Sequence, residues 1–314
     1  MVKKIAIVSL SSGILGEEFA KHEVEIGIKR LEEYGLEINI MPHAQSGIEY
    51  VKNHPKERAE DLLAAFADDS IDMIMTAIGG DDTIRLLPYI NFEIIKNNPK
   101  VFLGYSDTTI NHFMMYKAGL VSYYGGSLMN NWGEYVEINE YTKESLDKAF
   151  FNPQETYEVK PSKYCSYVDK KVRWCIDNIN VKRTVEEDTS GYEVLQGRGK
   201  VQGKLLGGCI ETFIYLIGTP FWPTLEEWEG KILFIEVSDE EESELPEYYF
   251  AWILRNLEAQ GIFNVIKGII MGKPPVKEKY DSYKEILFDI VSTDGKHNDL
   301  PIIYNVNFGH SSPI

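Results

Sequence analysis

The chain has 314 residues, more than the usual span of one hydrophobic core, so its length predicts two domains or one large α/β unit with an appended lobe. Its 49 acidic and 32 basic residues give a formal charge of −17, which repels phosphate backbones and anionic lipid heads. Nucleic acid polymers and membrane surfaces are therefore not expected as partners, and 44% hydrophobic residues indicate a folded globular protein.

The cysteine content and the N-terminus indicate a cytoplasmic protein. Cys165, Cys175 and Cys209 include no C-x-x-C pair and are odd in number, which predicts neither a disulfide framework nor a zinc knuckle. The apolar run near the N-terminus is too short for a signal peptide. No stretch approaches the roughly 20 apolar residues that a membrane span requires.

The first 105 residues alternate between strand and helix patterns. Strands are predicted at residues 4–10, 36–41, 71–78 and 101–105, and helices at 17–34 and 55–68. This alternation predicts a parallel sheet that is covered on both faces. Ligands of such sheets bind outside the carboxyl ends of the strands, so the loops after Leu10, Ile78 and Tyr105 are the candidate site loops.

The pattern changes at about residue 141, where a polar and irregular stretch continues to about residue 199. Beyond it, residues 205–217 begin a new structured region, strands are predicted at 231–237, 265–271 and 301–308, and a helix at 246–260. We therefore assign residues 1–145 to an N-terminal domain, 146–200 to a linker and substrate loop, and 201–314 to a C-terminal domain.

Ser106 follows the apolar strand at 101–105 and precedes a helical pattern. This is the context of a nucleophile elbow, a tight strand-to-helix turn that exposes a serine hydroxyl. The G-x-S-x-G motif is only half met, since Gly104 is present and Thr108 stands in place of the second glycine. The alternative is that Ser106 is the N-cap of the following helix.

A serine nucleophile needs a base and an acid that orients the base. His310 follows the strand at 301–308 and a glycine, whereas the other five histidines lie on predicted helices or polar loops. Glu236 ends the strand at 231–237, where a carboxylate is costly unless donors or charges receive it; the alternative is a salt-bridged strand end. The order Ser, Glu, His also occurs in α/β hydrolases, on a different fold. Ser106, Glu236 and His310 are therefore the predicted catalytic triad.

Glycines and acids next to the strand ends suggest further roles. Gly79 and Gly80 let backbone N–H groups approach closely, as could the N–H of Asp107, so an oxyanion hole is predicted here; the alternative is a plain turn. Asp81, Asp82 and Asp107 could instead hold a metal, but no H-E-x-x-H or paired-histidine spacing accompanies them, and helix N-caps are the simpler interpretation. The glycines lack the spacing of phosphate-binding loops, which disfavours nucleotide hydrolysis and dinucleotide binding.

The chain resembles the LD-carboxypeptidase family of serine peptidases nearly end to end, and within it the microcin C immunity branch. The resemblance rests on five motifs: Ala77-Ile-Gly-Gly-Asp-Asp-Thr-Ile-Arg-Leu-Leu-Pro88, Leu103-Gly-Tyr-Ser-Asp-Thr108, Gly203-Lys-Leu-Leu-Gly-Gly208, Ile232-Leu-Phe-Ile-Glu236 and Phe308-Gly-His-Ser-Ser-Pro313. It implies the same triad, with oxyanion amides near Gly80 and Asp107.

The resemblance also implies an N-terminal Rossmann-like lobe, a smaller C-terminal α/β lobe, an active site between them, a homodimer and a further strand beyond Ile314. Trp174 and Asp81 become candidate substrate-binding residues. Trp174 would stack on an adenine-like group unless it is a core residue. The expected substrate is a small peptide-like or aminoacyl-nucleotide compound, with no cofactor and no metal. The alternatives are a muropeptide tetrapeptide, cleaved in wall recycling, and a non-catalytic two-lobed ligand-binding protein.

Overall fold

The computed structural model describes residues 2–167, 171–238 and 247–311. The chain forms two compact units. The first unit comprises Met1–Glu158 and Val172–Arg183, and the second comprises Val159–Lys171 and Thr184–Ile314. Because Val172–Arg183 returns to the first unit, each unit is built from two separate segments of the chain.

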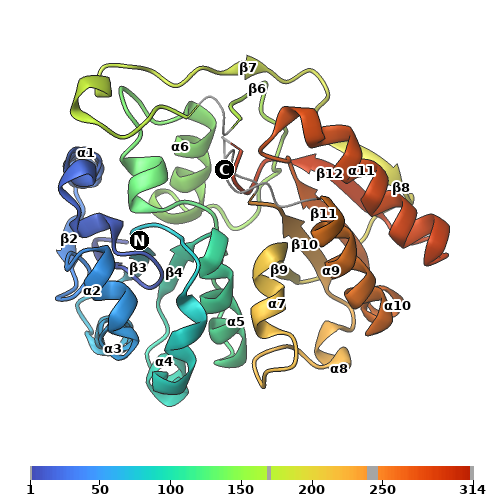
Figure 1. The fold of residues 1–314 in the computed structure, drawn as a ribbon, viewed down its shortest axis with the longest axis horizontal. Coiled ribbons are helices and arrows are strands. Elements are labelled where there is room, and N and C mark those ends of the chain that lie inside the picture. The colour runs from blue at the N-terminus through green and yellow to red at the C-terminus, as the bar shows by residue number, and fades with distance from the viewer. Residues whose placement is uncertain (1, 168–170, 239–246, 312–314) are drawn as a thin grey trace. The chain divides into compact units, whose positions relative to one another are not determined.

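The first unit contains a five-stranded parallel sheet (Figure 1). Its spatial order is β2-β1-β3-β4-β5, so the strand order reverses between β1 and β3, the position at which doubly wound sheets bind their ligands. The strands are β1 (Lys4–Val8), β2 (Glu37–Ile40), β3 (Met73–Thr76), β4 (Val101–Gly104) and β5 (Tyr123–Tyr124). The α-helices are α1 (Lys21–Glu33), α2 (Ile48–Asn53), α3 (Pro55–Ala67), α4 (Phe92–Asn97), α5 (Thr109–Lys117) and α6 (Glu140–Leu146).

The second unit contains a five-stranded sheet of order β8-β12-β11-β10-β9. Four of its strands are parallel, and β8 pairs antiparallel with β12 at one edge. The strands are β8 (Glu193–Gln196), β9 (Leu205–Cys209), β10 (Ile232–Glu236), β11 (Gly268–Gly272) and β12 (Ile302–Val306), with a separate pair β6 (Tyr164–Cys165) and β7 (Glu186–Glu187). The α-helices are α7 (Phe213–Leu216), α8 (Leu225–Trp228), α9 (Glu247–Ala259), α10 (Ile262–Val265) and α11 (Tyr280–Phe288).

The predicted fold class, an N-terminal unit with a Rossmann-like parallel sheet and a C-terminal α/β unit, is confirmed. The long buried strands were predicted within a few residues, whereas several short elements were missed: α2, β5, α6, α11 and the antiparallel edge strand β8. These segments are too short or too polar to show a clear period. Pro246, the first residue of the helix predicted at 246–260, lies outside the described residues. In the part of the chain that the structure describes, no helix is long and apolar enough to cross a membrane.

His112 on α5 locks the end of β4 in place. It is buried, its Nε2 lies 2.9 Å from the carbonyl oxygen of Gly104, and its Nδ1 lies 2.8 Å from Ser122 Oγ. The ring therefore donates from Nε2 to the carbonyl and accepts the serine hydroxyl, which makes it a structural histidine. Burial lowers the pKa of His112 from 6.5 to about 4.

The buried imidazole predicts a loss of stability in acid. The folded-state pKa of His112 lies below its unfolded value, so its contribution is complete above pH 6.5 and is lost as the pH falls towards about 4. Between pH 7 and pH 5 the loss is about 2 kcal/mol. Urea denaturation at both pH values should show this loss in the wild type and a smaller one in His112→Asn. An equal loss in the two proteins would contradict the assignment.

Candidate active site

Ser106 lies directly after β4 in a strained turn. It begins a short 3-10 turn (Ser106–Thr108) and has a φ of +65°, in the left-handed region. A non-glycine residue in this region costs about 1–3 kcal/mol and is retained where function requires it. No side-chain cap hydrogen bond is present at the start of this turn or of α5, so the interpretation of Ser106 as a helix N-cap is wrong. The backbone has the strand-to-helix geometry of a nucleophile elbow.

A hydrogen bond and close packing around Gly104 hold this turn. The backbone N–H of Ser106 donates to Tyr124 Oη at 3.0 Å. A Cβ on Gly104 would lie 2.5 Å from Thr76 Oγ1 and 2.6 Å from Thr108 Cγ2. The first glycine of the half-met motif is therefore sterically required, while the Thr108 methyl group fills the space above it.

The loop after β3 approaches Ser106 through Gly79. A Cβ on Gly79 would lie 2.8 Å from Ser106 Cβ and 3.0 Å from its Oγ. Gly80 has a φ of +148° and packs instead against Ser11 in the loop after β1. Backbone this close to a nucleophile can present amide donors to an oxyanion, and the donor roles of Gly80 and Asp107 stay predictions.

The Asp107 side chain connects the site loops. It is buried, and its Oδ2 accepts hydrogen bonds from Ser11 Oγ and from the backbone N–H of Thr83 at 2.9 Å. These donors come from the loops that follow β1 and β3. Asp107 therefore holds three loops together, and the backbone of the same residue is the candidate oxyanion donor.

Arg58 on α3 binds the loops that follow β1 and β3. Its Nη1 donates to the carbonyl oxygen of Leu10 at 3.0 Å, and its Nη2 lies 3.1 Å from Asp82 Oδ2. Burial lowers the pKa of the Arg58 guanidinium. Asp82 is thus an ion-pair partner within the loop, whereas its neighbour Asp81 is exposed.

Trp174 lies in the segment 172–183 that returns to the first unit. Tyr135 Oη donates to Glu23 and accepts the backbone N–H of Cys175 at 3.1 Å, next to Trp174. Because Glu23 is fully buried, this link anchors the segment to α1. Trp174 is partly exposed, and its role in substrate binding stays a prediction.

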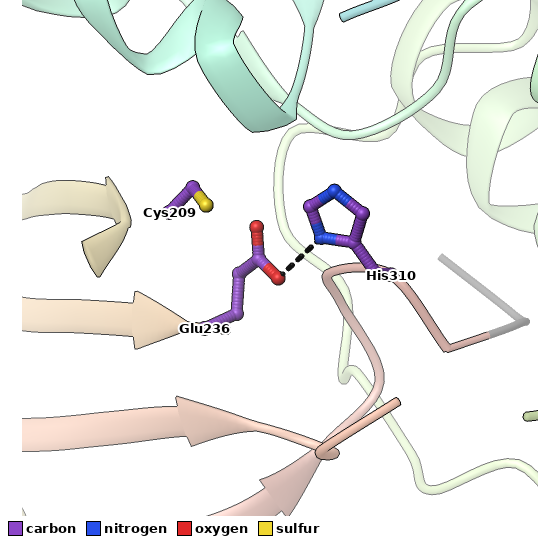
Figure 2. A group of neighbouring side chains, drawn as sticks. All are labelled: Cys209, Glu236 and His310. Atoms are coloured by element: carbon purple, nitrogen blue, oxygen red, sulfur yellow. Dashed lines mark hydrogen bonds and ion pairs between the residues drawn. The ribbon is translucent and has the colours of Figure 1, made fainter. Parts of the chain in front are cut away.

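Glu236 and His310 are hydrogen bonded in the second unit. Glu236 is the last residue of β10 and is fully buried, and its Oε2 lies 2.8 Å from Nδ1 of His310, which follows β12 (Figure 2). A carboxylate accepts, so Nδ1 carries the proton and Nε2 keeps its lone pair. This is the tautomer that a general base requires. The structure thus brings Glu236 and His310 together, while Ser106 belongs to the first unit.

Two glycines make room for the Glu236 side chain. A Cβ on Gly272 would lie 2.9 Å from Glu236 Cβ. Gly309 has a φ of +108°, and a Cβ there would lie 2.7 Å from Glu236 Oε2 and 3.0 Å from its Cγ. The residue before His310 must therefore be a glycine for both conformational and steric reasons.

Gly309→Ala is expected to lower the melting temperature and to displace His310. Gly218→Ala is the matched control, since Gly218 also has a positive φ, +86°, but nothing lies within 4 Å of its added Cβ. Both variants carry a backbone penalty of about 1 kcal/mol, and only Gly309→Ala adds a clash. Calorimetric scans should show a clearly larger decrease for Gly309→Ala. Equal decreases would mean that the Glu236 contact imposes no constraint.

Cys209 was not predicted as a site residue, although it lies beside Glu236. It ends β9, and the parallel register pairs it directly with Glu236 on β10. Its Sγ donates to Glu211 Oε2 at 3.0 Å. Burial, with the charges of Glu211 and Glu236, raises the pKa of the Cys209 thiol, and burial also raises the pKa of Glu211. The sequence places Cys209 near the end of a structured segment, but it does not show that this segment pairs with the strand that ends at Glu236.

Two family models match this chain. One describes the LD-carboxypeptidase N-terminal domain and covers residues 5–125, and the other describes the LD-carboxypeptidase C-terminal domain and covers residues 202–314. The fold and these matches define a hydrolase of the peptidase class that is built from two α/β units. The chain belongs to the LD-carboxypeptidase family.

The relatives include MccF-type proteins and a murein peptide carboxypeptidase. A solved structure of an MccF-like protein from Streptococcus pneumoniae in complex with AMP is 40% identical, covers 100% of this chain and 93% of its own, and has a TM-score of 0.90. The microcin C7 self-immunity protein MccF of Escherichia coli is 30% identical over 82% of this chain and 72% of its own length. A probable murein peptide carboxypeptidase of Bacillus subtilis is 28% identical over 90% of this chain and 77% of its own length.

Proposed function

We propose that the chain is a serine hydrolase that cleaves an amide bond in an aminoacyl- or peptidyl-nucleotide, as in microcin C detoxification. The observation that supports hydrolysis most directly is the hydrogen bond between His310 Nδ1 and the buried Glu236 carboxylate. It leaves Nε2 able to accept a proton. The strained turn at Ser106 supplies the matching candidate nucleophile.

In the proposed cycle, Ser106 Oγ attacks the substrate carbonyl carbon while its proton moves to His310 Nε2. Glu236 holds the ring and stabilises the imidazolium. Backbone amides near Gly80 and Asp107 receive the oxyanion. His310 then protonates the leaving amine, and water, activated by the same imidazole, hydrolyses the ester on Ser106. His310 thus passes the proton of Ser106 to the leaving amine in acylation, and in deacylation it passes a proton from water back to Ser106 Oγ, so no cofactor is needed.

The substrate class rests on the relative that was solved with AMP, which is 40% identical over the whole of this chain. Trp174 is partly exposed, on a segment anchored through Tyr135, and its indole ring is the proposed stacking partner of the nucleobase. Asp81, exposed in the loop after β3, is the second proposed substrate contact. Trp174→Ala should therefore weaken AMP binding while the fold is retained.

The second candidate substrate is a muropeptide tetrapeptide, which the likeness to the murein peptide carboxypeptidase favours. A side-by-side assay with an aminoacyl sulfamoyl adenosine and an L,D-tetrapeptide decides between the two. We expect the nucleoside compound to give the higher kcat/KM. Preference for the tetrapeptide would assign the chain to wall recycling instead.

A non-catalytic ligand-binding protein would cleave neither compound. A fluorophosphonate probe separates this possibility, because it labels only an activated serine. Mass spectrometry should find the label on Ser106. We also propose a cytoplasmic homodimer: Cys165, Cys175 and Cys209 are all free thiols, as a reducing compartment permits, and light scattering tests the dimer.

A further inference from the structure

Cys209, Glu236 and His310 form a compact group of three different metal-binding side chains. One ligand atom from each lies within 4.8 Å of the other two. Figure 2 shows the thiol and the carboxylate extending from neighbouring strand ends, with the imidazole on the other side of the carboxylate. The proposed catalytic cycle uses Glu236 and His310 but gives Cys209 no role.

The three donors suit zinc. Thiolate, imidazole and carboxylate are its ordinary protein ligands, and three of them leave the fourth tetrahedral position to water. Bonds of about 2.0–2.3 Å place neighbouring ligand atoms roughly 3.3–3.7 Å apart. His310 Nδ1 and Glu236 Oε2 are 2.8 Å apart, and the widest separation in the group is at most 4.8 Å. Shifts of about 1 Å would therefore close the site around an ion.

We propose that Cys209, Glu236 and His310 bind Zn²⁺, or another divalent metal that prefers sulfur and nitrogen ligands. This binding inhibits the enzyme, because the Glu236–His310 pair can no longer act as the catalytic base. The metal takes the place of the hydrogen bond between the two residues. The inhibitory consequence rests on the proposed function, whereas the binding itself does not.

Charge and proton balance favour this exchange. Zn²⁺ displaces to solvent the thiol proton that Cys209 donates to Glu211, so the ion and its thiolate and carboxylate ligands sum to zero in a buried site. The proton on His310 Nδ1 moves to Nε2, and the ring stays neutral. With Nε2 protonated, the imidazole can no longer accept a proton from a nucleophile.

Cobalt provides a readout that does not depend on activity. Co²⁺ added to the full chain, free of affinity histidines, should produce a thiolate-to-cobalt charge-transfer band that saturates at one equivalent. Cys209→Ser and Cys209→Ala should abolish the band. Cys165→Ser, which removes another buried free thiol of the same unit, should keep it. An unchanged band in both Cys209 variants, or no band in the wild type, would overturn the site.

Zinc tests the consequence. Calorimetry in buffers of different ionisation enthalpy should show one site and one proton released, with affinity in Cys209→Ser reduced by more than the roughly 10–100-fold that loss of an outer-shell partner costs. Zn²⁺ at one equivalent should stop hydrolysis of the preferred substrate, and a chelator should restore it. Hydrolysis that continues with zinc bound at Cys209 would overturn the proposed inhibition. Zinc binding by a protein that hydrolyses neither substrate without metal would support the site and refute the proposed function.

Discussion

Replacing Ser106 with alanine is expected to lower kcat by at least about 10³-fold while leaving the fold intact. The hydroxyl is the proposed nucleophile, and alanine removes only Oγ. The packing of the turn against Gly79 and Gly104 and the hydrogen bond from its backbone N–H to Tyr124 do not depend on this atom. Steady-state kinetics on the preferred substrate, with circular dichroism as the check on folding, measures the effect.

Ser106→Gly separates the chemistry from the backbone strain. Glycine adopts a φ of +65° without penalty, so this variant should be as inactive as Ser106→Ala but more stable than the wild type, by about 1 kcal/mol. A protein that stores strain at its nucleophile gains stability when the nucleophile is lost. Turnover at the wild-type rate in either variant would eliminate Ser106 as the nucleophile.

Much of the fold could be predicted because the central strands are nearly continuous apolar runs. Met73–Thr76 is buried throughout, and such a run is typical of a parallel strand that is covered on both faces. Candidate site residues could then be found by position alone, since polar residues at the ends of buried strands are costly unless they have a use. Ser106, Glu236 and His310 all follow this rule.

The contacts between strands could not be predicted, because register and neighbouring strands depend on residues far apart in the chain. Cys209 pairs with Glu236 although the two positions are 27 residues apart in the chain. His310 follows β12, so its approach to both residues depends on β11 lying between β10 and β12. The choice of Gly79 rather than Gly80 as the neighbour of Ser106 likewise follows from backbone angles that no residue pattern specifies. The return of Trp174 to the first unit is a third such contact.

Replacing Glu236 with glutamine is expected to lower kcat by about 10⁴-fold with little change in structure. Glutamine has nearly the same shape, but its amide can donate to His310 Nδ1, which favours the tautomer that carries its proton on Nε2. That tautomer cannot take the proton of Ser106. The low-field proton resonance of His310 Nδ1–H should be present in the wild type and absent in the variant, which ties the kinetic loss to the tautomer.

The second unit supplies a matched control for this substitution. Glu258 Oε2 lies 2.8 Å from His297 Nε2, the same distance as in the Glu236–His310 pair, but both residues lie outside the proposed site. Glu258→Gln removes the same charge from a histidine–carboxylate contact of equal length, although a more exposed one, and should leave kcat unchanged. A general requirement for histidine–carboxylate pairs in this fold would reduce kcat in both variants. A loss confined to Glu236→Gln assigns the effect to the orientation of one imidazole.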